Sequence, residues 1–495
     1  MAKNKKLLTR RRLLLGTATL AITGAAASLY FSPASLAQTT GNSKTPLNIP
    51  PLDKGRLEGN TRIYDLNIQD GTSEFIPGLK TATRGINGSF LAPVLRMTKG
   101  ENVRLNVSNS IGEDTTLHWH GFNLPAKTDG GPHQIVKPGT TWSPEFLIRE
   151  KASTMWYHSH LLHKTAEQVW AGIAGMIIID DEESKTLDLP NTYGVDDLPI
   201  ALQDRNIRTN GSMPYSPSMP DNMMGLRGKI PMANGTIGAF FDVSTALVRL
   251  RLLNGANAAI YTLGFSDNRP FKQIASDGGL LENPVEMSRL LLAPGERAEI
   301  IVDMSNGTNT TLTHFGDEAQ GQGGMMGGSN TRFSFLELRP AGQLRQSAPI
   351  PQTLTSLPKI STSKVENTRQ LVLNMSMGGM MFGGGFTIND EEMDINVINN
   401  VVPKGVTEIW ELSNRSELAH PLHIHNTQFR IIDRNGKAPN PNEAGLKDTV
   451  LIQPNEKVRI LIRFDEYSDP DRPYMYHCHI LEHEDAGMMG QFTVV

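Results

Sequence analysis

Apolar and polar residues alternate along a short stretch in each third of the chain, and an asparagine follows each stretch closely. The three stretches are 103–107 before Asn109, 246–252 before Asn254 and 408–412 before Asn414. A period of two is typical of a β-strand with one buried face. Its recurrence at long spacing predicts three units of similar construction.

A turn motif repeats in the same three parts of the chain. It reads Lys137-Pro138-Gly139, then Ala293-Pro294-Gly295, then Gln453-Pro454-Asn455, each before another strand-like stretch. Strands separated by turns at this density favour β-sandwiches over helical domains. The length of 495 residues also suits three domains of roughly 150 residues each. We therefore predict an all-β protein with domains at 45–185, 195–347 and 368–495.

The first 37 residues have the composition of an export signal. Arginines occupy positions 10–12, an apolar run covers 13–31, and Ser35-Leu36-Ala37 forms a small-residue cleavage site. The segment 9–14 resembles a twin-arginine signal, whose proteins are exported already folded. A transmembrane anchor is less favoured, because small and polar residues dilute the apolar run. We expect a periplasmic or secreted mature chain that does not insert into the membrane.

Charge and cysteine content further limit the classes of function that the protein can have. The chain has 47 basic and 51 acidic residues; six basic residues belong to the predicted signal, which leaves 41 and a formal charge of −10. This balance argues against nucleic acid as a partner. Cys478 is the only cysteine, so no intrachain disulfide forms. Its position between two histidines indicates metal binding.

Ten of the thirteen histidines gather in four short clusters. The clusters are His118 and His120; His158 and His160; His420, His423 and His425; and His477, His479 and His483. On a strand, residues i and i+2 point to one side and residue i+1 to the other. Each His-x-His pair can therefore aim two imidazoles at one metal, while Cys478 faces a second metal. For His133, His163 and His314 we expect ordinary surface or core roles.

The types of ligand indicate which metal these clusters hold. A thiolate, two imidazoles and a weak thioether define a blue-copper electron-transfer site. Cys478, His420, His483 and Met488 supply these four groups. The eight further clustered histidines can hold three more copper ions, which together can deliver the electrons that break the O–O bond. Zinc is the alternative metal, but it does not change oxidation state.

All four clusters, in this order, resemble the copper-binding motifs of the multicopper oxidases, in particular bacterial copper-efflux oxidases and three-domain laccases. The resemblance extends to the segments 129–132, 445–450 and 482–489, and covers nearly the whole chain after the signal. It implies three cupredoxin-like Greek-key β-sandwiches, four copper ions and the reduction of dioxygen to water. The three-copper cluster would lie between the first and third domains, because the ligands come only from those two thirds.

The resemblance also implies a ligand set for each copper ion. The type 1 ligands would be His420, Cys478, His483 and Met488, and the type 2 ligands His118 and His423. One type 3 ion would use His120, His158 and His479, and its partner His160, His425 and His477.

Three residues receive catalytic roles from the resemblance. Cys478 would connect the type 1 copper to the cluster through its two histidine neighbours. Asp129 and Glu484 match acidic residues of the family near the cluster, and dioxygen reduction consumes protons. We expect both carboxyls to relay protons. Without the resemblance, we would interpret both as surface carboxylates.

The sequence indicates the type of reaction more clearly than it indicates the substrate. One hypothesis is laccase-like oxidation of phenols and aryl amines, and the other is a metallo-oxidase for Cu(I) or Fe(II). The Gly/Met-rich tracts 321–328 and 375–385, expected to be flexible loops, favour the second, because thioethers suit Cu(I). Ser416 and Leu418 count against it, because the copper-efflux oxidases have Asp and Met there. Acidic residues at 390–394 are the candidate substitutes.

Two further classes of function remain as alternatives. The first is a protein without catalytic activity, either a copper store or a cell-division scaffold of this fold. The complete ligand set argues against the scaffold. A two-domain copper nitrite reductase also has blue-copper and type 2 centres, but the paired histidines and the third domain disfavour it. We expect a monomer whose partners are O2 and a small reducing substrate.

Overall fold

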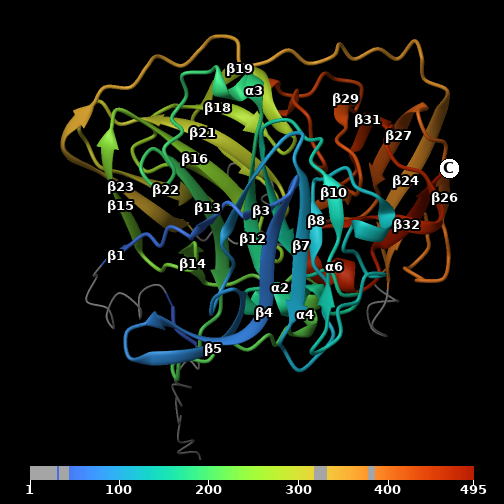
Figure 1. Cartoon of the computed structure of the whole chain (residues 1–495), viewed down its shortest axis with the longest axis horizontal. Helices are drawn as coiled ribbons and strands as arrows, with labels where there is room; N and C mark the ends of the chain where they lie inside the picture. Colours follow the sequence, from blue (N-terminus) through green and yellow to red (C-terminus); the bar gives the residue numbers. More distant parts are fainter. Residues whose placement is uncertain (1–29, 33–43, 317–331, 377–384) are drawn as a thin grey trace, which may run out of the picture.

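The computed structural model describes residues 30–32, 44–316, 332–376 and 385–495, which form six β-sheets and a few short helices (Figure 1). The sheets make three sandwiches, each with its own apolar core. The predicted all-β fold of three cupredoxin-like sandwiches is confirmed. Most of the predicted signal, the tract 321–328 and the greater part of the tract 375–385 lie outside the described residues. No described helix has the length and apolar character needed to cross a membrane.

The first sandwich, in blue and cyan in Figure 1, has two sheets. One sheet contains β3 (Arg56–Glu58), β4 (Thr61–Ile76), β5 (Leu79–Ile86), β7 (Asn102–Asn109), β9 (Thr141–Trp142) and β10 (Glu145–Leu147). Its strands run in the order β10-β7-β4-β3, and β5 pairs with β4 and β9 with β7. The other has the order β2-β6-β12-β11-β8; its strands are β2 (Leu52–Asp53), β6 (Val94–Thr98), β8 (His118–His120), β11 (Ser153–His158) and β12 (Ala174–Asp180).

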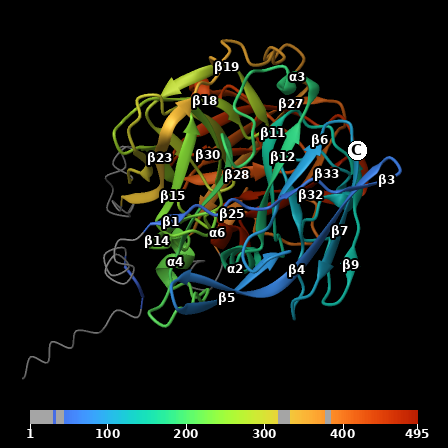
Figure 2. The same cartoon turned by 60° about the vertical axis from the view of Figure 1, so that its left-hand side comes forward.

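The middle sandwich, in green and yellow, lies beside the first (Figures 1 and 2). One sheet has the order β14-β13-β16-β21-β18-β19; its strands are β13 (Asp197–Arg205), β14 (Ile230–Ala233), β16 (Leu247–Asn254), β18 (Phe271–Ser276), β19 (Gly279–Met287) and β21 (Arg297–Asp303). The other has the order β1-β15-β23-β22-β17-β20; its strands are β1 (Thr45–Pro46), β15 (Ala239–Thr245), β17 (Tyr261–Phe265), β20 (Leu290–Leu292), β22 (Thr310–His314) and β23 (Phe333–Arg345).

The last sandwich is orange and red in Figure 1. One sheet has the order β25-β24-β27-β31-β29; its strands are β24 (Asn367–Met375), β25 (Phe386–Ile388), β27 (Thr407–Asn414), β29 (Arg430–Arg434) and β31 (Lys457–Arg463). The other has the order β26-β33-β32-β28-β30; its strands are β26 (Asn400–Val402), β28 (His420–Ile424), β30 (Thr449–Ile452), β32 (Asp469–Cys478) and β33 (Met489–Val494).

Short helices join the three sandwiches. They are η1 (Ala126–Thr128), α2 (Thr165–Ala171), α3 (Glu182–Lys185), α4 (Met219–Met224), η3 (Pro441–Glu443) and α6 (Leu481–Asp485). Asp485 of α6 accepts hydrogen bonds from the first two backbone N–H groups of α2, at 3.0 and 2.9 Å. At the other end of α2, Arg205 of the middle sandwich donates to the carbonyls of Val169 and Trp170. Groups that a helix leaves unpaired at its ends thus bind α2 to both other sandwiches.

The asparagine after each alternating strand makes the same hydrogen bonds in all three sandwiches. Asn254 donates to the carbonyls of Ala259 and Leu292, both at 2.8 Å, and accepts from the backbone N–H two residues later. Asn109 and Asn414 also donate to two backbone carbonyls and accept from the N–H two residues later. The repeated asparagine therefore closes the loop that follows each strand.

The polar face of β16 differs from the simple half-buried strand that its alternation predicts. Arg249 and Arg251 are only 7% and 3% exposed. Arg251 donates to both carboxylate oxygens of Asp197, at 2.6 and 3.0 Å, and to Glu299 at 2.8 Å. Glu299 also accepts from the hydroxyl of Thr154 in the first sandwich. This polar face meets another domain instead of water, a distinction that alternation alone does not make.

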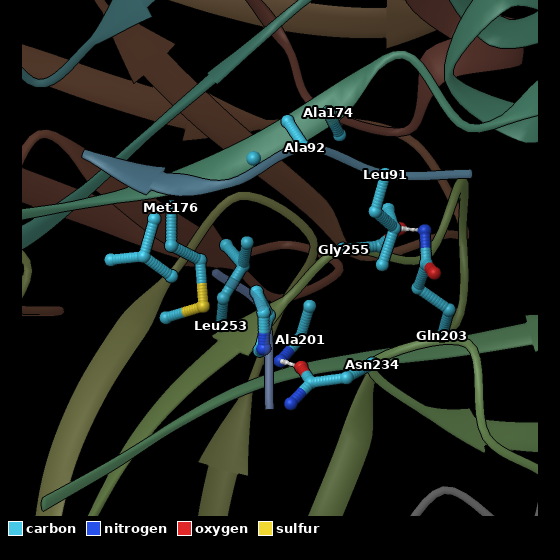
Figure 3. Close-up of a pocket in the computed structure, with 12 residues that line it drawn as sticks. Leu91, Ala92, Ala174, Met176, Ala201, Gln203, Asn234, Leu253 and Gly255 are labelled. Atoms are coloured by element: carbon cyan, nitrogen blue, oxygen red, sulfur yellow. Dashed lines mark hydrogen bonds between the residues drawn. The ribbon is translucent and has the colours of Figure 1, made fainter. Parts of the chain in front are cut away.

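A small cavity of about 20 Å³ lies between the first and middle sandwiches (Figure 3). Leu91, Met176 and Leu253 contribute apolar walls. Its two amides are bound to backbone, since Gln203 donates to the Gly255 carbonyl and Asn234 accepts from a backbone N–H at 2.7 Å. A space of this size holds one water molecule. It is too small for a phenolic substrate.

Two amino-terminal segments pack on the middle sandwich. β1 pairs in parallel with β15, although the predicted first domain begins at residue 45. Phe31, inside the predicted signal, is buried, and its backbone N–H donates to the Ile207 carbonyl at 2.9 Å. The domain limits and the end of the signal stay predictions.

Replacing Asn254 with alanine would leave two buried carbonyls without their partner. We expect the free energy of unfolding to fall by about 2–4 kcal/mol, measured by calorimetry as a lower melting temperature. Asn191→Ala, at an exposed position, should change stability by less than about 0.5 kcal/mol. Equal melting temperatures for the two variants would contradict the loop-closing role.

Candidate metal centres

Four strands carry histidines into the interface between the first and last sandwiches. In the first sandwich, His118 of β8 is paired with His158 of β11. In the last, His423 of β28 is paired with His477 of β32. Because side chains alternate along a strand, each His-x-His pair directs its rings to the same side. All ten clustered imidazoles are buried.

These rings gather in groups of three, in which the candidate ligand atoms lie within 4.8 Å of one another. The imidazole groups are His120, His158 and His479; His160, His425 and His477; and His118, His423 and His425. Cys478 forms a fourth group with His420 and His483. The structure thus brings together the histidines and cysteine that the sequence assigns to each copper ion. His425 additionally lies beside the predicted type 2 pair, whose ring centroids are 5.8 Å apart.

Several ring nitrogens in these groups are buried and have no hydrogen-bond partner among the described residues. They include His118 Nε2, His120 Nδ1, His158 Nε2, His423 Nε2 and both nitrogens of His479. In His118, His158 and His423, the opposite nitrogen donates to a backbone carbonyl at 2.9, 2.8 and 2.9 Å. A neutral imidazole carries a single N–H, so the unpaired nitrogen holds a lone pair. Buried lone pairs that face one another fit a metal cation.

A similar arrangement holds the His160, His425 and His477 group. The Nε2 atom of His477 lies 3.2 Å from that of His160 and 3.2 Å from that of His425. The outer nitrogens point away, since His425 Nδ1 donates to Asp129 at 2.7 Å and His477 Nδ1 to the Cys478 carbonyl at 3.1 Å. The outer bonds therefore orient the inner nitrogens toward one point, as metal ligands require.

Burial keeps these rings in the form that binds metals. It lowers the pKa of His420 and His479 to about 3, and that of His160 to about 4. These three rings are then neutral at neutral pH, with a free lone pair. Burial also raises the pKa of the Cys478 thiol, so that its thiolate form needs a cation beside it.

The thiol group lies inside the apolar core of the last sandwich. Cys478 Sγ is 3.4 Å from His420 Nδ1 and 3.7 Å from His483 Nδ1. Met488 is buried in the same core, and its carbonyl accepts from the Cys478 N–H at 2.9 Å. The outer nitrogen of His420 is hydrogen-bonded to Ser416 Oγ at 2.7 Å. Thiol, imidazole and thioether are the ligand types that copper prefers.

The methionine-bearing helix α4 and the ring of Phe386 meet at the outer side of His483. Its Nε2 donates to the carbonyl of Met223 in α4 at 3.0 Å, and α4 also contains Met219 and Met224. The ring of Phe386 stacks on the imidazole, with centroids 4.3 Å apart. Phe386 comes directly after the second Gly/Met-rich tract, and Met377, Met380 and Met381 of that tract lie outside the described residues.

Both predicted acidic residues contact the imidazole groups. Asp129 binds His425 through its side chain and His118 through its carbonyl, and burial raises its pKa to about 8. Glu484 has one oxygen 3.2 Å from His160 Nδ1 and the other 3.1 Å from His477 Nδ1. Although burial alone would raise the pKa of Glu484, these two rings outweigh it and hold the pKa below its ordinary value. Neither carboxyl is at the surface.

The sequence interpretation missed one residue at the site, Asp448. Its carboxylate is 3.1 Å from His120 Nε2, and its carbonyl accepts from His423 Nδ1. In the sequence, Asp448 is marked only by its place in the segment 445–450, which resembles the family but singles out no residue. Outside the groups, His314 accepts from a backbone N–H in the middle sandwich, and His133 is exposed.

Comparison with known proteins places this arrangement in a family. Profiles described as multicopper oxidase match residues 67–184 and 362–495. Multicopper oxidase mco of Staphylococcus haemolyticus is 33% identical, over 92% of this chain and 94% of its own. Cell division protein FtsP of Xenorhabdus nematophila is 36% identical over the same shares, 92% and 94%. The solved structure of the laccase-like multi-copper oxidase CueO from Ochrobactrum sp. has a TM-score of 0.84 and 37% identity, over 91% of this chain and 100% of that one.

The fold and the buried imidazole and thiol groups define a three-domain cupredoxin protein with sites of the kind that hold copper. With relatives of this similarity over nearly its whole length, the chain belongs to the multicopper oxidase family.

Proposed function

We propose that the protein is a laccase-like oxidase that removes single electrons from a small reducing substrate, such as a phenol or aryl amine, and reduces dioxygen to water. One observation carries this proposal. Buried, unpaired imidazole nitrogens from the first and last sandwiches face one another beside a strand that also carries Cys478. A store or scaffold needs no such arrangement, because it has no electrons to move between two centres.

The residues would hold four copper ions. His420, Cys478, His483 and Met488 would hold the type 1 ion, and His118 with His423 the type 2 ion. The type 3 ions would use His120, His158 and His479, and His160, His425 and His477. Four bound copper ions would supply one-electron chemistry at the type 1 site and, together, the four electrons that dioxygen requires.

The chain itself supplies the connection between the two centres. Cys478 lies between His477 and His479 in sequence, and its carbonyl accepts a hydrogen bond from His477. One residue of backbone and one hydrogen bond therefore separate the thiol from the cluster ligands. Four substrate molecules, each oxidised by one electron, balance the four electrons and four protons that convert O2 into two water molecules.

Replacing Cys478 with serine tests the type 1 site. A hydroxyl does not replace a thiolate as a ligand for this ion, so we expect the blue absorption to vanish, the copper content to fall by one ion per chain, and oxygen uptake to stop. His133→Ala, outside the groups, should change none of these. Retained blue colour would contradict the assignment, and wild-type protein that consumes no oxygen with any reductant would leave only a binding role.

Asp129 and Glu484 are proposed to deliver protons, because each contacts two rings of the cluster. We expect Asp129→Asn and Glu484→Gln to keep the copper content and the blue absorption but to lower kcat by about 100-fold. Asp433→Asn, at a buried carboxylate that pairs with Arg459, is the control and should retain kcat. Unchanged turnover in both site variants would remove the relay role.

The contacts of His483 favour a second candidate, oxidation of Cu(I). The Met223 carbonyl of the methionine-bearing helix α4 and the ring of Phe386, which follows the Gly/Met-rich tract in sequence, contact this one imidazole. Thioethers are soft ligands that collect Cu(I), and His483 would receive its electron directly. Ser416, on the other type 1 imidazole, stands where copper-efflux oxidases have an acid, so any such site would lie on the His483 side.

Met377, Met380 and Met381 can be changed to leucine together, which keeps the side-chain bulk and removes the sulfur. If the tract serves Cu(I), the variant should lose cuprous oxidase activity, with a raised KM, and keep phenol oxidation. Met287→Leu, in the middle sandwich, is the matched control. Equal cuprous kinetics in the triple variant and the wild type would exclude the tract as a Cu(I) site.

The amino-terminal pattern supports one further part of the proposal, a periplasmic or secreted location reached by twin-arginine export. Fractionation of cells that express the chain checks it, and a cytoplasmic mature protein would refute it.

A further inference from the structure

None of the described residues of the middle sandwich belongs to the imidazole groups, yet one of its turns contacts them. Gly295 lies in this turn with φ of +82°, and a Cβ atom there would lie 2.7 Å from the His479 ring. Two residues later, Arg297 begins β21 and is only 1% exposed. The turn therefore places a buried cation directly behind the cluster ligands.

All five N–H donors of the Arg297 guanidinium have an oxygen acceptor. Three donate to backbone carbonyls, of Thr154 at 3.0 Å, Gly295 at 2.9 Å and Asp277 at 3.2 Å. The other two donate to the two carboxylate oxygens of Asp448, at 2.8 and 2.5 Å. Thr154 is on β11, the strand that ends at His158. A planar fork held at this many points has one orientation only.

Asp448 transmits that orientation to one ligand from each of the other two sandwiches. Its carboxylate accepts from His120 Nε2 at 3.1 Å and from Thr449 Oγ1 at 2.9 Å. Its carbonyl accepts from His423 Nδ1 at 2.9 Å. These bonds fix the N–H of each ring on the outer side, which leaves His120 Nδ1 and His423 Nε2 as the unpaired inner nitrogens.

The backbone after His120 is shaped around the same contact. Gly121 has φ of +96°, and a Cβ atom there would lie 2.7 Å from Asp448 Oδ2 and 2.8 Å from Arg297 Nη2. Only glycine leaves room for this ion pair beside the strand end that carries His120. A pair that merely joined domains would not need to touch two imidazoles and their backbone.

We propose that Arg297 is a positioning residue for the copper cluster, which acts through Asp448 to set the ring orientation of His120 and His423. The middle sandwich thus supplies the arginine that orients ligands from the first and the last sandwich. This inference rests on the proposed function, since it assumes that these imidazoles hold copper.

The test uses Arg297→Lys, which keeps the charge and removes the planar fork. We expect it to retain the blue absorption of the type 1 site and to lose copper from the cluster that His120 and His423 help to hold, with an affinity about 10- to 100-fold lower and an altered type 2 electron paramagnetic resonance signal. Arg251→Lys is the matched control, because Arg251 is equally buried and holds Asp197 with the same fork. The control should keep the wild-type type 2 signal despite a similar loss of thermal stability.

A type 2 signal and copper content in Arg297→Lys equal to those of the wild type would overturn the inference. So would an equal loss in Arg251→Lys, since the effect would then come from general destabilisation. If Arg297→Lys does not fold, Asp448→Asn takes its place and should show the same type 2 change. A wild-type signal in Asp448→Asn would reject a specific positioning role, and so would failure of both variants to fold. Absence of copper from the wild type would instead refute the proposed function.

Discussion

The rest of this structure depends on buried imidazole nitrogens that have no hydrogen-bond partner in the described part of the chain. A buried polar group left unpaired costs on the order of 1–3 kcal/mol, and several such nitrogens meet between the first and last sandwiches. The outer nitrogens of most of these rings are bound to carbonyls or carboxylates, so the rings cannot turn to relieve the cost. A cation among the lone pairs removes this cost, which couples metal binding to the stability of the domain interface.

The three sandwiches contribute to this interface in different ways. The first and last provide the rings, and the middle one contacts both without contributing a ligand from its described residues. Its buried arginines lie on faces that meet other domains: Arg251 pairs with Asp197 of the same sandwich, and Arg297 pairs with Asp448 of the last sandwich. Helix α2 shows the same principle on a smaller scale, because its two ends are capped from different sandwiches.

The substrate question centres on the outer sides of His420 and His483. His420 is covered by Ser416, a neutral hydroxyl that offers little attraction to a metal ion. His483 is covered by a backbone carbonyl of α4 and by the Phe386 ring. An aromatic substrate and a cuprous ion would both have to deliver electrons through these covers, so the two substrate hypotheses share the type 1 centre and differ in what lies above it.

The sequence by itself determined the sandwich architecture, the four ligand clusters and the metal they suit, because strand periodicity and ligand chemistry are local properties. It also marked Asn109, Asn254 and Asn414 as equivalent before their shared hydrogen bonds were visible. Only the tertiary structure decided that Arg251 contacts another domain, that Asp448 contacts two ligand rings, and that Arg297 holds Asp448. Those contacts join residues from different domains, and no pattern along one strand encodes which surface will cover it.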